Sequence, residues 1–598
     1  MFQDFENAPL RSTSEGATRL ADVRRLMRLA KLDAFIVPRE DAYQGEYVPP
    51  YGERLNWLTG FNGSAGLAVV LPRKAALFVD GRYVLQAAYQ VDKKLFTPIH
   101  SAEVSPARWL LKNLKKNARV GLDARLHTQN FVTRLAKHLS TIGAKIVMLP
   151  TNPIDKLWQE RPAPPATKVE AQPLRLTGRS SFDKRKTLAK QMREAGIDAT
   201  PISKPENIAW LLNIRGRDVP HTPFALSFGV LHKSGRFDWY IEKHRVSNSV
   251  MKAVGKNVTI CKPAQLAAGL AALAKKSIAL DATSTPAWFV QQLKNSRIIE
   301  APDPCALPKA CKTKAEIKGA EAAHKRDGVA LCQFLCWLEA TAPDVKITEI
   351  DAAQKIEAFR MASGHLRDLS FDSISGTAAH GAIVHYRVTH ATNQKLRNGD
   401  IYLLDSGGQY SDGTTDVTRT LLIGTKKPKR EVVDAFTRVL RGHIALAMVQ
   451  FPHGTSGTQL DALARAPLWA AGLDFAHGTG HGVGSYLSVH EGPHRISKGG
   501  DEPLRDGMIV SNEPGYYKAG DFGIRIENLQ YVVPLADMLC FKTLTLAPIE
   551  RRLIDPTMLA PDERAWLNAY HKRVAAEITP HLPDAATKRW LKRVCKSL

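Results

Sequence analysis

Hydrophobic positions in the first 300 residues follow two periods. An apolar spacing typical of a helix runs from Leu20 to Lys31, and the short apolar run DAFIVP follows at residues 33–38. Two further apolar stretches, NWLTGFNGSAGLAVVL and ALFVDGRYVLQA, come next. Because spacings of three to four residues favour helices and short continuous apolar runs favour buried strands, this region predicts alternating helices and strands.

The same arrangement occurs twice along the chain. Residues 32–34 and 56–58, Leu-Asp-Ala and Asn-Trp-Leu, are echoed by Ile-Asp-Ala at 197–199 and Ala-Trp-Leu at 209–211. The two copies are about 150–165 positions apart, and the first carries an insertion around EYVPPYGER. A repeated arrangement at this distance predicts two related α/β domains.

Proline-rich sequence separates the copies and a helical pattern opens the last region. The stretch TNPIDKLWQERPAPPATKVEAQP predicts an extended linker at about residues 150–175. A long amphipathic pattern begins near Lys314, and glycine-broken strand patterns follow from Ser370. A chain of 598 residues exceeds one hydrophobic core. We therefore expect domains at residues 1–155, 175–305 and 310–598.

Composition indicates a reduced, aqueous environment. No apolar stretch reaches the roughly 18 residues of a membrane-spanning helix, and the acidic N-terminal segment MFQDFENAPLRSTSEG does not resemble a signal peptide. The seven cysteines form no C-x-x-C pair, which argues against a zinc ribbon or a disulfide framework. We expect a cytoplasmic protein, with Cys332 and Cys336 packed in a core.

The net charge of +25 is unusual and raises the question of an anionic partner. The densest basic patches, Lys426 to Arg430 and Lys588 to Lys596, have one nearby aromatic residue, Trp590. Nucleic-acid surfaces usually interleave several aromatic side chains for base stacking. The pattern therefore favours a solvated basic surface, and we expect neither nucleic acid nor membrane as a partner.

Four acidic residues lie close to predicted strands. Asp405 ends an apolar strand and Asp416 precedes the next, so a hairpin would bring together two residues that are 11 positions apart. Glu513 ends a later strand, and Glu527 is expected inside the following one, where alternation puts Arg525 on the same face. An acid beside an apolar strand is costly unless it is solvated, paired or bound to metal, and each alone is ambiguous.

The segment HGTGHGVGSYLSVHEGP adds His477, His481 and His490. A single loop histidine is usually a surface or hydrogen-bonded residue, but three within 14 positions, in a chain with two carboxylate pairs, favour a metal site. One imidazole with four carboxylates suits Mn²⁺ or Co²⁺ better than a thiolate-loving zinc site. Two divalent cations would balance four carboxylate charges, which predicts two metals.

These residues resemble the pita-bread metallopeptidases, which include Xaa-Pro aminopeptidases, prolidases, methionine aminopeptidases and creatinases. The strings LLDSGGQYSDGTTDVTRT, SNEPGYY and GIRIEN, with WLTGFNGSAG and WLLNIRGRD farther upstream, most resemble the three-domain cytosolic Xaa-Pro aminopeptidases. The family's metal-ligand order is matched by Asp405, Asp416, His481, Glu513 and Glu527. The resemblance implies an α/β (α+β) protein: two creatinase-like domains followed by a pita-bread catalytic domain.

The resemblance also implies a role for each metal ligand. Asp405 would bind one metal ion, Asp416 and Glu527 would bridge both, and His481 and Glu513 would complete the shell of the second. Glu513 would also accept the proton of the attacking water.

The remaining candidates lie on the substrate side. The resemblance implies that His490 stabilises the oxyanion, that His477 assists the leaving proline nitrogen, and that His385 is a third substrate-side histidine. Arg525 is expected to support the ligands from behind. Arg387 and His494 fall where related sequences vary, which leaves the subsite preference open.

The implied activity is hydrolysis of the N-terminal Xaa-Pro bond by a hydroxide that bridges two divalent metals, with Mn²⁺ expected and Co²⁺ or Zn²⁺ as alternatives. The partners are peptides with proline in the second position and, by family resemblance, a second copy in a homodimer. One alternative is a prolidase-like Xaa-Pro dipeptidase. The other is a non-catalytic pita-bread protein that binds nucleic acid.

Overall fold

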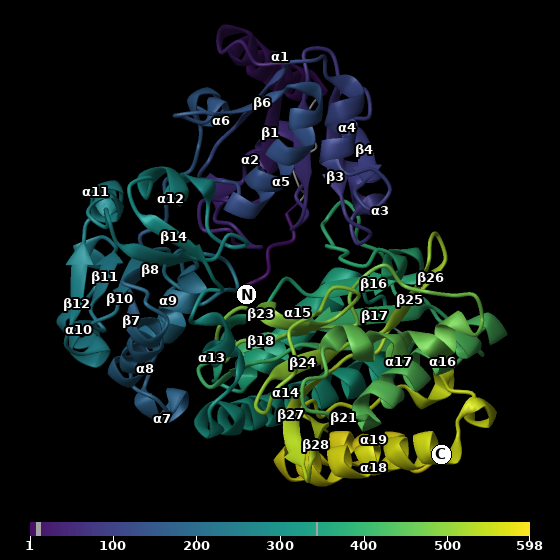
Figure 1. Ribbon diagram of the computed structural model, residues 1–598. Helices are drawn as coiled ribbons and strands as arrows, with labels where there is room; N and C mark the ends of the chain where they lie inside the picture. Colours follow the sequence, from purple (N-terminus) through teal and green to yellow (C-terminus); the bar gives the residue numbers. More distant parts are fainter. Residues whose placement is uncertain (7–12, 343–344) are drawn as a thin grey trace. The chain divides into compact units, whose positions relative to one another are not determined.

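The computed structural model describes residues 1–6, 13–342 and 345–598 (Figure 1). Residues 7–12 of the acidic N-terminal segment, and residues 343–344, lie outside this description. The chain divides into two compact units. One holds residues 13–174 and 179–306, and the other holds residues 1–6, Arg175–Gly178 and the C-terminal half from Leu307.

The first unit contains two six-stranded sheets. The strand order of the first sheet is β4-β3-β2-β1-β5-β6. Its strands are β1 (Ala34–Pro38), β2 (Leu67–Val70), β3 (Ala75–Val79), β4 (Thr97–His100), β5 (Arg119–Leu122) and β6 (Lys145–Met148). Its helices are α1 (Thr13–Leu29), α2 (Arg54–Thr59), α3 (Val84–Gln90), α4 (Pro106–Asn113), α5 (Gln129–Leu139) and α6 (Pro153–Leu157).

Alternation along β1 gives this sheet two apolar faces, as expected for a sheet covered by helices on both sides. Phe35 and Val37 pack in the same cluster as Leu20 of α1. Ala34 and Ile36 pack in a second cluster with α4 and α5. The predicted helix is therefore confirmed from Leu20 to Leu29 as part of α1, whose inward positions meet one face of the sheet, and it ends two residues before Lys31.

The second sheet repeats the first in strand order and direction, β12-β11-β10-β8-β13-β14. Its strands are β8 (Ala199–Ile202), β10 (Phe228–His232), β11 (Phe237–Tyr240), β12 (Val258–Cys261), β13 (Ser277–Leu280) and β14 (Arg297–Glu300). Its helices are α8 (Ser181–Glu194), α9 (Pro205–Leu212), α10 (Asn248–Val254), α11 (Leu266–Ala271) and α12 (Ala287–Gln292). The predicted duplication is confirmed.

One aspartate makes the same backbone hydrogen bonds in both copies. The Asp33 carboxylate accepts the backbone N–H of Arg119 at 2.8 Å, and the Asp198 carboxylate accepts that of Ser277 at 2.9 Å. In each copy the aspartate's own N–H donates back to the carbonyl of the same partner residue. The Leu/Ile-Asp-Ala motif therefore joins the first strand to its parallel neighbour.

The C-terminal half contains four further sheets of two to six strands. Their orders are β15-β18-β19, β16-β17-β20, β25-β26 and β21-β28-β27-β24-β22-β23. The strands are β15 (Leu366–Leu369), β16 (Ile374–Thr377), β17 (Ile401–Ser406), β18 (Gly408–Tyr410), β19 (Gly413–Thr414), β20 (Val417–Leu422), β21 (Gln450–Pro452), β22 (Gly480–Gly482), β23 (Glu491–Ile496), β24 (Ile509–Asn512), β25 (Gly515–Lys518), β26 (Phe522–Arg525), β27 (Asn528–Leu535) and β28 (Met538–Thr543).

Helices pack along these sheets. They are α13 (Ala306–Ala310), α14 (Lys314–Thr341), α15 (Glu349–Ala362), α16 (Arg430–Met448), α17 (Gly457–Trp469), α18 (Pro561–Ile578) and α19 (Ala585–Val594). In Figure 1, α16 and α17 run beside the sheets, and α18 and α19 are the yellow helices at the C-terminal end. Thr313 and Glu316 cap the first turn of α14 reciprocally, which explains why the predicted helix begins at Lys314.

Two other predictions concern the helices: the packing of two cysteines and the lack of a membrane-spanning segment. Cys332 of α14 is fully buried in the core beside Phe436 and Leu440, and Cys336 is half-buried. Within the described ranges of the chain, none of the helices combines the length and the apolar character that a bilayer crossing requires.

The core histidines of this half give a pH-dependent stability. The Nε2 atom of His571 accepts the backbone N–H of Ile549 at 3.0 Å, and burial, with the nearby charge of Arg419, lowers its pKa to about 3. An unfolded histidine protonates near pH 6.5, so the unfolded state binds more protons and stability falls as the pH drops below that value.

We predict that His571→Gln flattens this dependence. Between about pH 6.5 and pH 4, the free energy of unfolding of the unmodified chain should lose about 1.4 kcal/mol per pH unit more than that of the variant. Guanidinium denaturation of metal-loaded protein at several pH values measures both slopes. His453→Gln, at an exposed position, is the matched control and should keep the original slope. Equal slopes in all three proteins would contradict the interpretation.

Candidate metal centre

Asp405 and Asp416 come together because β17 and β20 are antiparallel neighbours. Asp405 lies opposite Thr418 in the ladder, and Asp416 immediately precedes β20. The predicted pairing is confirmed, but the connection is more than a hairpin loop, since it contains β18 and β19, which belong to another sheet. Side chains two apart share a face, so Asp416 and Thr418 both point toward Asp405.

Glu513 and Glu527 come from the ends of other strands. Glu513 directly follows β24, as predicted. Glu527 was expected inside a strand, and this is wrong: it lies in the two-residue link between β26 and β27. The chain changes sheets at this link, since β26 pairs with β25 and β27 pairs with β24. The prediction that Arg525 and Glu527 share one face nevertheless holds, because Ile524 and Ile526 point the other way, into the core.

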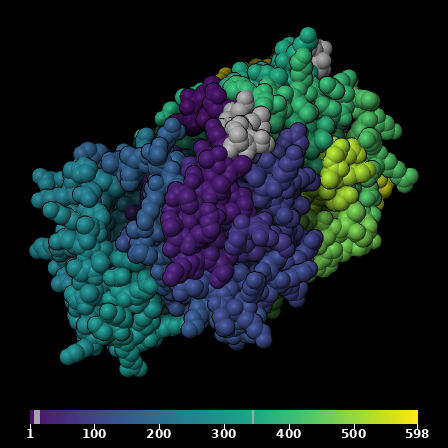
Figure 2. Space-filling model, turned by 90° about the horizontal axis from the view of Figure 1, so that it is seen from above, coloured from purple at the N-terminus to yellow at the C-terminus, as the bar shows by residue number. Residues whose placement is uncertain are grey.

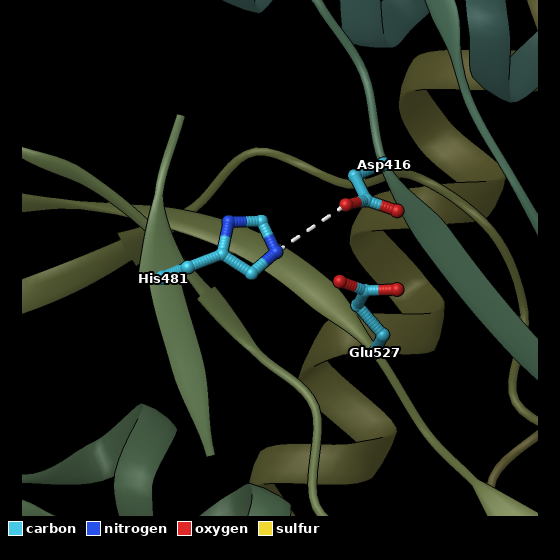
Figure 3. Close-up of side chains that lie close together, drawn as sticks. All are labelled: Asp416, His481 and Glu527. Carbon is cyan, nitrogen blue, oxygen red and sulfur yellow. Dashed lines mark ion pairs between the residues drawn. The ribbon is translucent and has the colours of Figure 1, made fainter. Parts of the chain in front are cut away.

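His481 presents one particular nitrogen to these acids. Its Nδ1 lies 2.9 Å from the carbonyl oxygen of Gly482, which can only accept, so Nδ1 carries the proton and Nε2 is left with its lone pair. Nε2 lies 3.5 Å from Oδ2 of Asp416 and 3.4 Å from Oε1 of Glu513. Figure 3 shows the ring edge directed at Asp416, with the Glu527 carboxylate beside it.

These side chains form a group with the donors of a metal site. Asp416, His481 and Glu527 each offer one ligand atom, and the three atoms lie within 4.8 Å of one another. Asp416 and Glu527 are buried, and the Glu513 side chain, at 18% exposure, lies at the rim. The buried Oδ1 atoms of Asp405 and Asp416 have no hydrogen-bond partner among the described residues.

The acids are electrostatically unfavourable when they are ionised together. Burial, followed by the charges of Asp405 and Glu513, raises the pKa of Asp416 well above its ordinary value. Burial and the charge of Asp416 do the same to the pKa of Glu527. Burial also raises the pKa of Glu513, although His481 opposes the shift. Carboxylate oxygens without hydrogen-bond partners, together with the repulsion between the acids, fit a site for divalent cations. Such cations bind the oxygens as ligands and supply positive charge that offsets the repulsion.

Arg525 supports this group from behind. It donates to Oδ2 of Asp405 at 2.6 Å, to the Tyr517 hydroxyl at 2.6 Å and to Oγ1 of Thr418 at 3.1 Å. Thr418 in turn donates to Oε2 of Glu527 at 2.8 Å. Burial opposes the Arg525 charge, yet Tyr517 and Asp405 hold its pKa well above the ordinary value. The interpretation of Arg525 as a supporting residue agrees with these contacts.

His477 reaches the site through Tyr517. Its Nδ1 faces the carbonyl of Gly478 at 2.8 Å, so Nε2 accepts the Tyr517 hydroxyl hydrogen at 2.8 Å. Both ring nitrogens are thus engaged, and Tyr517, half-buried with its pKa raised by burial to about 12, stands between His477 and Arg525.

The other two histidines differ in how they are placed. The ring of His490 packs edge-on against His481, with centroids 4.3 Å apart. His385 is half-buried in the irregular segment after the 3₁₀ turn Ala378–Ala382, between buried Val384 and Tyr386. His490 therefore belongs to the group by contact, whereas the role of His385 stays a prediction.

A buried ion-pair cluster lies beside His490, and the sequence patterns did not predict it. Glu491 opens β23, opposite Gly482 of β22, and its carboxylate pairs with Lys309 at 2.9 Å and also with Lys312. All three side chains are at most 1% exposed. The cluster fixes the backbone next to His490. The lysines lie about 180 positions away in sequence, so no local pattern could have revealed them.

Smaller supporting groups were also missed. Ser511 accepts the His481 backbone N–H at 2.9 Å and donates to Oε1 of Glu513 at 3.1 Å. Thr418 and Tyr517 carry the Arg525 contacts described above. The position of Thr418, two residues after Asp416, was the one available signal, because alternate strand residues share a face.

Comparison with known families covers most of the chain. The creatinase/prolidase N-terminal domain matches twice, at residues 19–154 and 160–316. Metallopeptidase family M24 matches residues 318–534, and the C-terminal region of peptidase M24 matches residues 537–598.

Similar proteins extend over the same length. Aminopeptidase P1 of Lotus japonicus is 36% identical over 94% of this chain and 96% of its own length. Xaa-Pro aminopeptidase 1 of Dictyostelium discoideum is 36% identical over 97% of this chain and 96% of its own. The crystal structure of X-prolyl aminopeptidase from Caenorhabditis elegans, described as a cytosolic enzyme with a di-nuclear active site, superimposes with a TM-score of 0.93 at 33% identity, covering 98% of this chain and 100% of that chain.

The Glu491 cluster yields a stability prediction. Glu491→Gln leaves two buried lysines without their carboxylate, and breaking a buried pair in this way costs about 3–5 kcal/mol of unfolding free energy. Guanidinium denaturation measures the loss. The matched change Glu321→Gln removes the partner of the half-exposed Lys542 and should cost less than about 1 kcal/mol. Similar losses in the two variants would show that the cluster does not stabilise this region.

Proposed function

The chain belongs to metallopeptidase family M24, and on that premise we propose that it is a dinuclear-metal Xaa-Pro aminopeptidase, which removes the first residue of peptides whose second residue is proline. The observation that carries this proposal is the group of Asp405, Asp416, His481, Glu513 and Glu527, brought together from strands far apart in sequence. The full-length similarity to the di-nuclear nematode enzyme supports the activity.

We assign the ligands by their placement around the group. Asp405 would hold one metal ion, Asp416 and Glu527 would be shared by the two, and His481 with Glu513 would hold the other. The contact of His481 Nε2 with both Asp416 and Glu513 supports this division. When bound, two divalent cations lower the pKa of water and polarise a carbonyl group. The carboxylate-rich donor set favours Mn²⁺, with Co²⁺ or Zn²⁺ as alternatives.

Surrounding residues then orient the reaction. Glu513, at the rim, takes the proton of the attacking water. His490, packed on His481, donates to the oxygen that becomes negative when the peptide carbonyl is attacked. Arg525 holds Asp405 in place through its 2.6 Å contact. The two ring contacts of His477 favour a positioning role, in which it fixes the Tyr517 hydroxyl beside the leaving group. The proton that Glu513 takes from the water then passes to the proline nitrogen as the peptide C–N bond breaks.

The substrate bond sets its own requirement. The amide before proline has no N–H, so a site that cleaves it must recognise the ring rather than an amide donor. An aminopeptidase must also recognise a free amino terminus, and Asp405, whose Oδ1 has no hydrogen-bond partner among the described residues, is the acid we propose for this contact. His385 is proposed as a further substrate contact.

Three further points belong to the proposal. The domains span residues 1–155, 175–305 and 310–598, the protein acts in the cytoplasm, and it forms a homodimer. The prolidase alternative is disfavoured by domain content: Dipeptidase PepE from Mycobacterium ulcerans, 28% identical, covers 62% of this chain, whereas the nematode enzyme covers 98%.

Substrate length and metal dependence test the activity. We expect the protein to cleave Xaa-Pro-Xaa tripeptides at least tenfold faster, by kcat/KM, than Xaa-Pro dipeptides. Chelation should abolish cleavage, and added Mn²⁺ should restore it. Metal analysis should find two ions per chain, and fewer in Asp416→Asn, which removes a bridging charge. A preference for dipeptides would support a prolidase instead.

Two substitutions test the assigned roles. Glu513→Gln and His490→Ala should each lower kcat by about 10²–10³, the usual effect of losing a proton acceptor or an oxyanion donor. Glu502→Gln and His453→Ala, which lie outside the group, are the matched controls and should keep full activity. Turnover close to that of the unmodified protein in both site variants would refute the scheme.

A further inference from the structure

The first sheet of the N-terminal unit carries a large hollow at its β4 edge. Its volume is about 740 Å³, and it is lined by α1, α4 and the beginnings of β3 and β4. Figure 1 labels these elements, and the space-filling view of Figure 2 shows this part of the chain in purple to blue. Cavities of about 300–1,000 Å³ are typical of small-molecule sites.

The rim of the hollow is strongly basic. Seven cationic side chains contribute to it and no acidic one does among the described residues. They are Arg24 of α1, Arg73 and Lys74 of the β2–β3 turn, Lys93 and Lys94 before β4, and Arg108 and Lys112 of α4. The floor is apolar and includes Leu20 and Trp109. Convergence of seven cations on one concavity distinguishes it from an ordinary solvated face.

The protein itself does not neutralise these cations. Lys74 donates to the side-chain oxygen of Asn113 at 2.9 Å, and Arg24 to the carbonyl of Leu71 at 3.0 Å, so both partners are uncharged. Of the nearby acids, Asp92 accepts the backbone N–H of Lys94, and Glu103 pairs with His100. Within the described ranges, none of the seven forms an ion pair with a carboxylate.

The duplicated sheet carries an arginine at the corresponding position of its first helix. The offset of 165 residues that relates Asp33 to Asp198 also relates Leu20 to Arg185, and both of these inward side chains are 1% exposed. In the second copy the Arg185 guanidinium reaches the loops that connect the strands. It donates to the carbonyls of Gly235, Val254 and Lys256 at 2.8–3.0 Å, in the loops that correspond to those of the first hollow.

In the first copy this internal cation is absent. Leu20 has no polar atom to offer the bordering loops, and those loops carry cations around the hollow. An anion is the group that satisfies such a rim, because it relieves the repulsion among like charges. Arginine and lysine bind phosphate oxygens by charge-assisted hydrogen bonds. Seven cations around about 740 Å³ match several phosphates on one compact molecule.

We propose that this hollow binds a compact polyphosphate anion, a small molecule or a lipid headgroup that carries two or more clustered phosphate groups. The site lies on the first sheet, in a unit distinct from the one that holds the candidate metal centre. It gives part of the +25 net charge a specific use.

Calorimetric titration of the metal-loaded full chain with inorganic tripolyphosphate tests the proposal. Mg²⁺ is kept in excess over the probe so that the resident metals are not extracted. The unmodified protein should bind saturably, and added salt should weaken binding. The variant with Lys74→Gln, Arg108→Gln and Lys112→Gln should bind at least about tenfold more weakly.

A matched control separates the hollow from bulk charge. Arg589→Gln, Lys592→Gln and Lys596→Gln remove the same charge from exposed positions near the C-terminus and should leave the affinity within about twofold.

The source of the phosphates is decided by a second assay. Co-sedimentation with phosphatidylcholine vesicles, with and without phosphatidylinositol 4,5-bisphosphate, detects a headgroup ligand, and pocket-dependent binding to either probe supports the proposal. Absence of binding to both probes overturns it, as does an equal loss in both triple variants. Binding only to single-stranded RNA also overturns it. All variants should retain Xaa-Pro cleavage, so failure here is distinguishable from failure of the proposed activity.

Discussion

Repulsion among the carboxylates Asp405, Asp416, Glu513 and Glu527 is the constraint on which the catalytic half depends. In a buried site these acids cannot all ionise without compensation, and burial together with neighbouring charge raises the pKa of three of them. Among the described residues, the Arg525 guanidinium and a few hydroxyl donors offset this charge. The Oδ1 atoms of Asp405 and Asp416 find no hydrogen-bond partner there, so the site keeps negative charge available for cations.

The backbone must resist that repulsion, and it does so with buried cations placed behind the strands. Arg419, on the opposite face of β20 from Thr418, donates to the carbonyl of Glu527 at 2.6 Å and to the hydroxyl of Tyr570 in α18 at 3.0 Å. The C-terminal helices are thereby tied to the link that carries a ligand. Lys309 and Lys312 stabilise the backbone next to His490 in a similar way, through their ion pairs with Glu491.

The sequence was most informative where a pattern is local. Alternation placed Arg525 and Glu527 on one face, and the apolar strands around Asp405 and Asp416 predicted their pairing. The duplicated domains followed from short motifs whose aspartates repeat the same hydrogen bonds. Glu527 was assigned to a strand interior because periodicity cannot show that a chain leaves one sheet and enters another.

Long-range partners were beyond such reasoning. The two lysines behind Glu491, the Tyr517 bridge to His477 and the basic hollow beside α1 depend on side chains that meet only after the sheets have formed. The metal-ligand order itself came from family resemblance, since spacing alone left every acid ambiguous. The hydrophobic pattern predicted the strands, and the family resemblance predicted the metal ligands and the reaction.

The contact between Arg525 and Asp405 joins residues that are 120 positions apart, and this has a consequence for biosynthesis. A ribosome adding about 5–20 residues per second needs several seconds or more to travel that distance. During that time Asp405 and Asp416 have emerged without the rest of their ligand set. High-affinity metal capture therefore becomes available only late in translation, and a chain truncated before β26 has no means of assembling the centre.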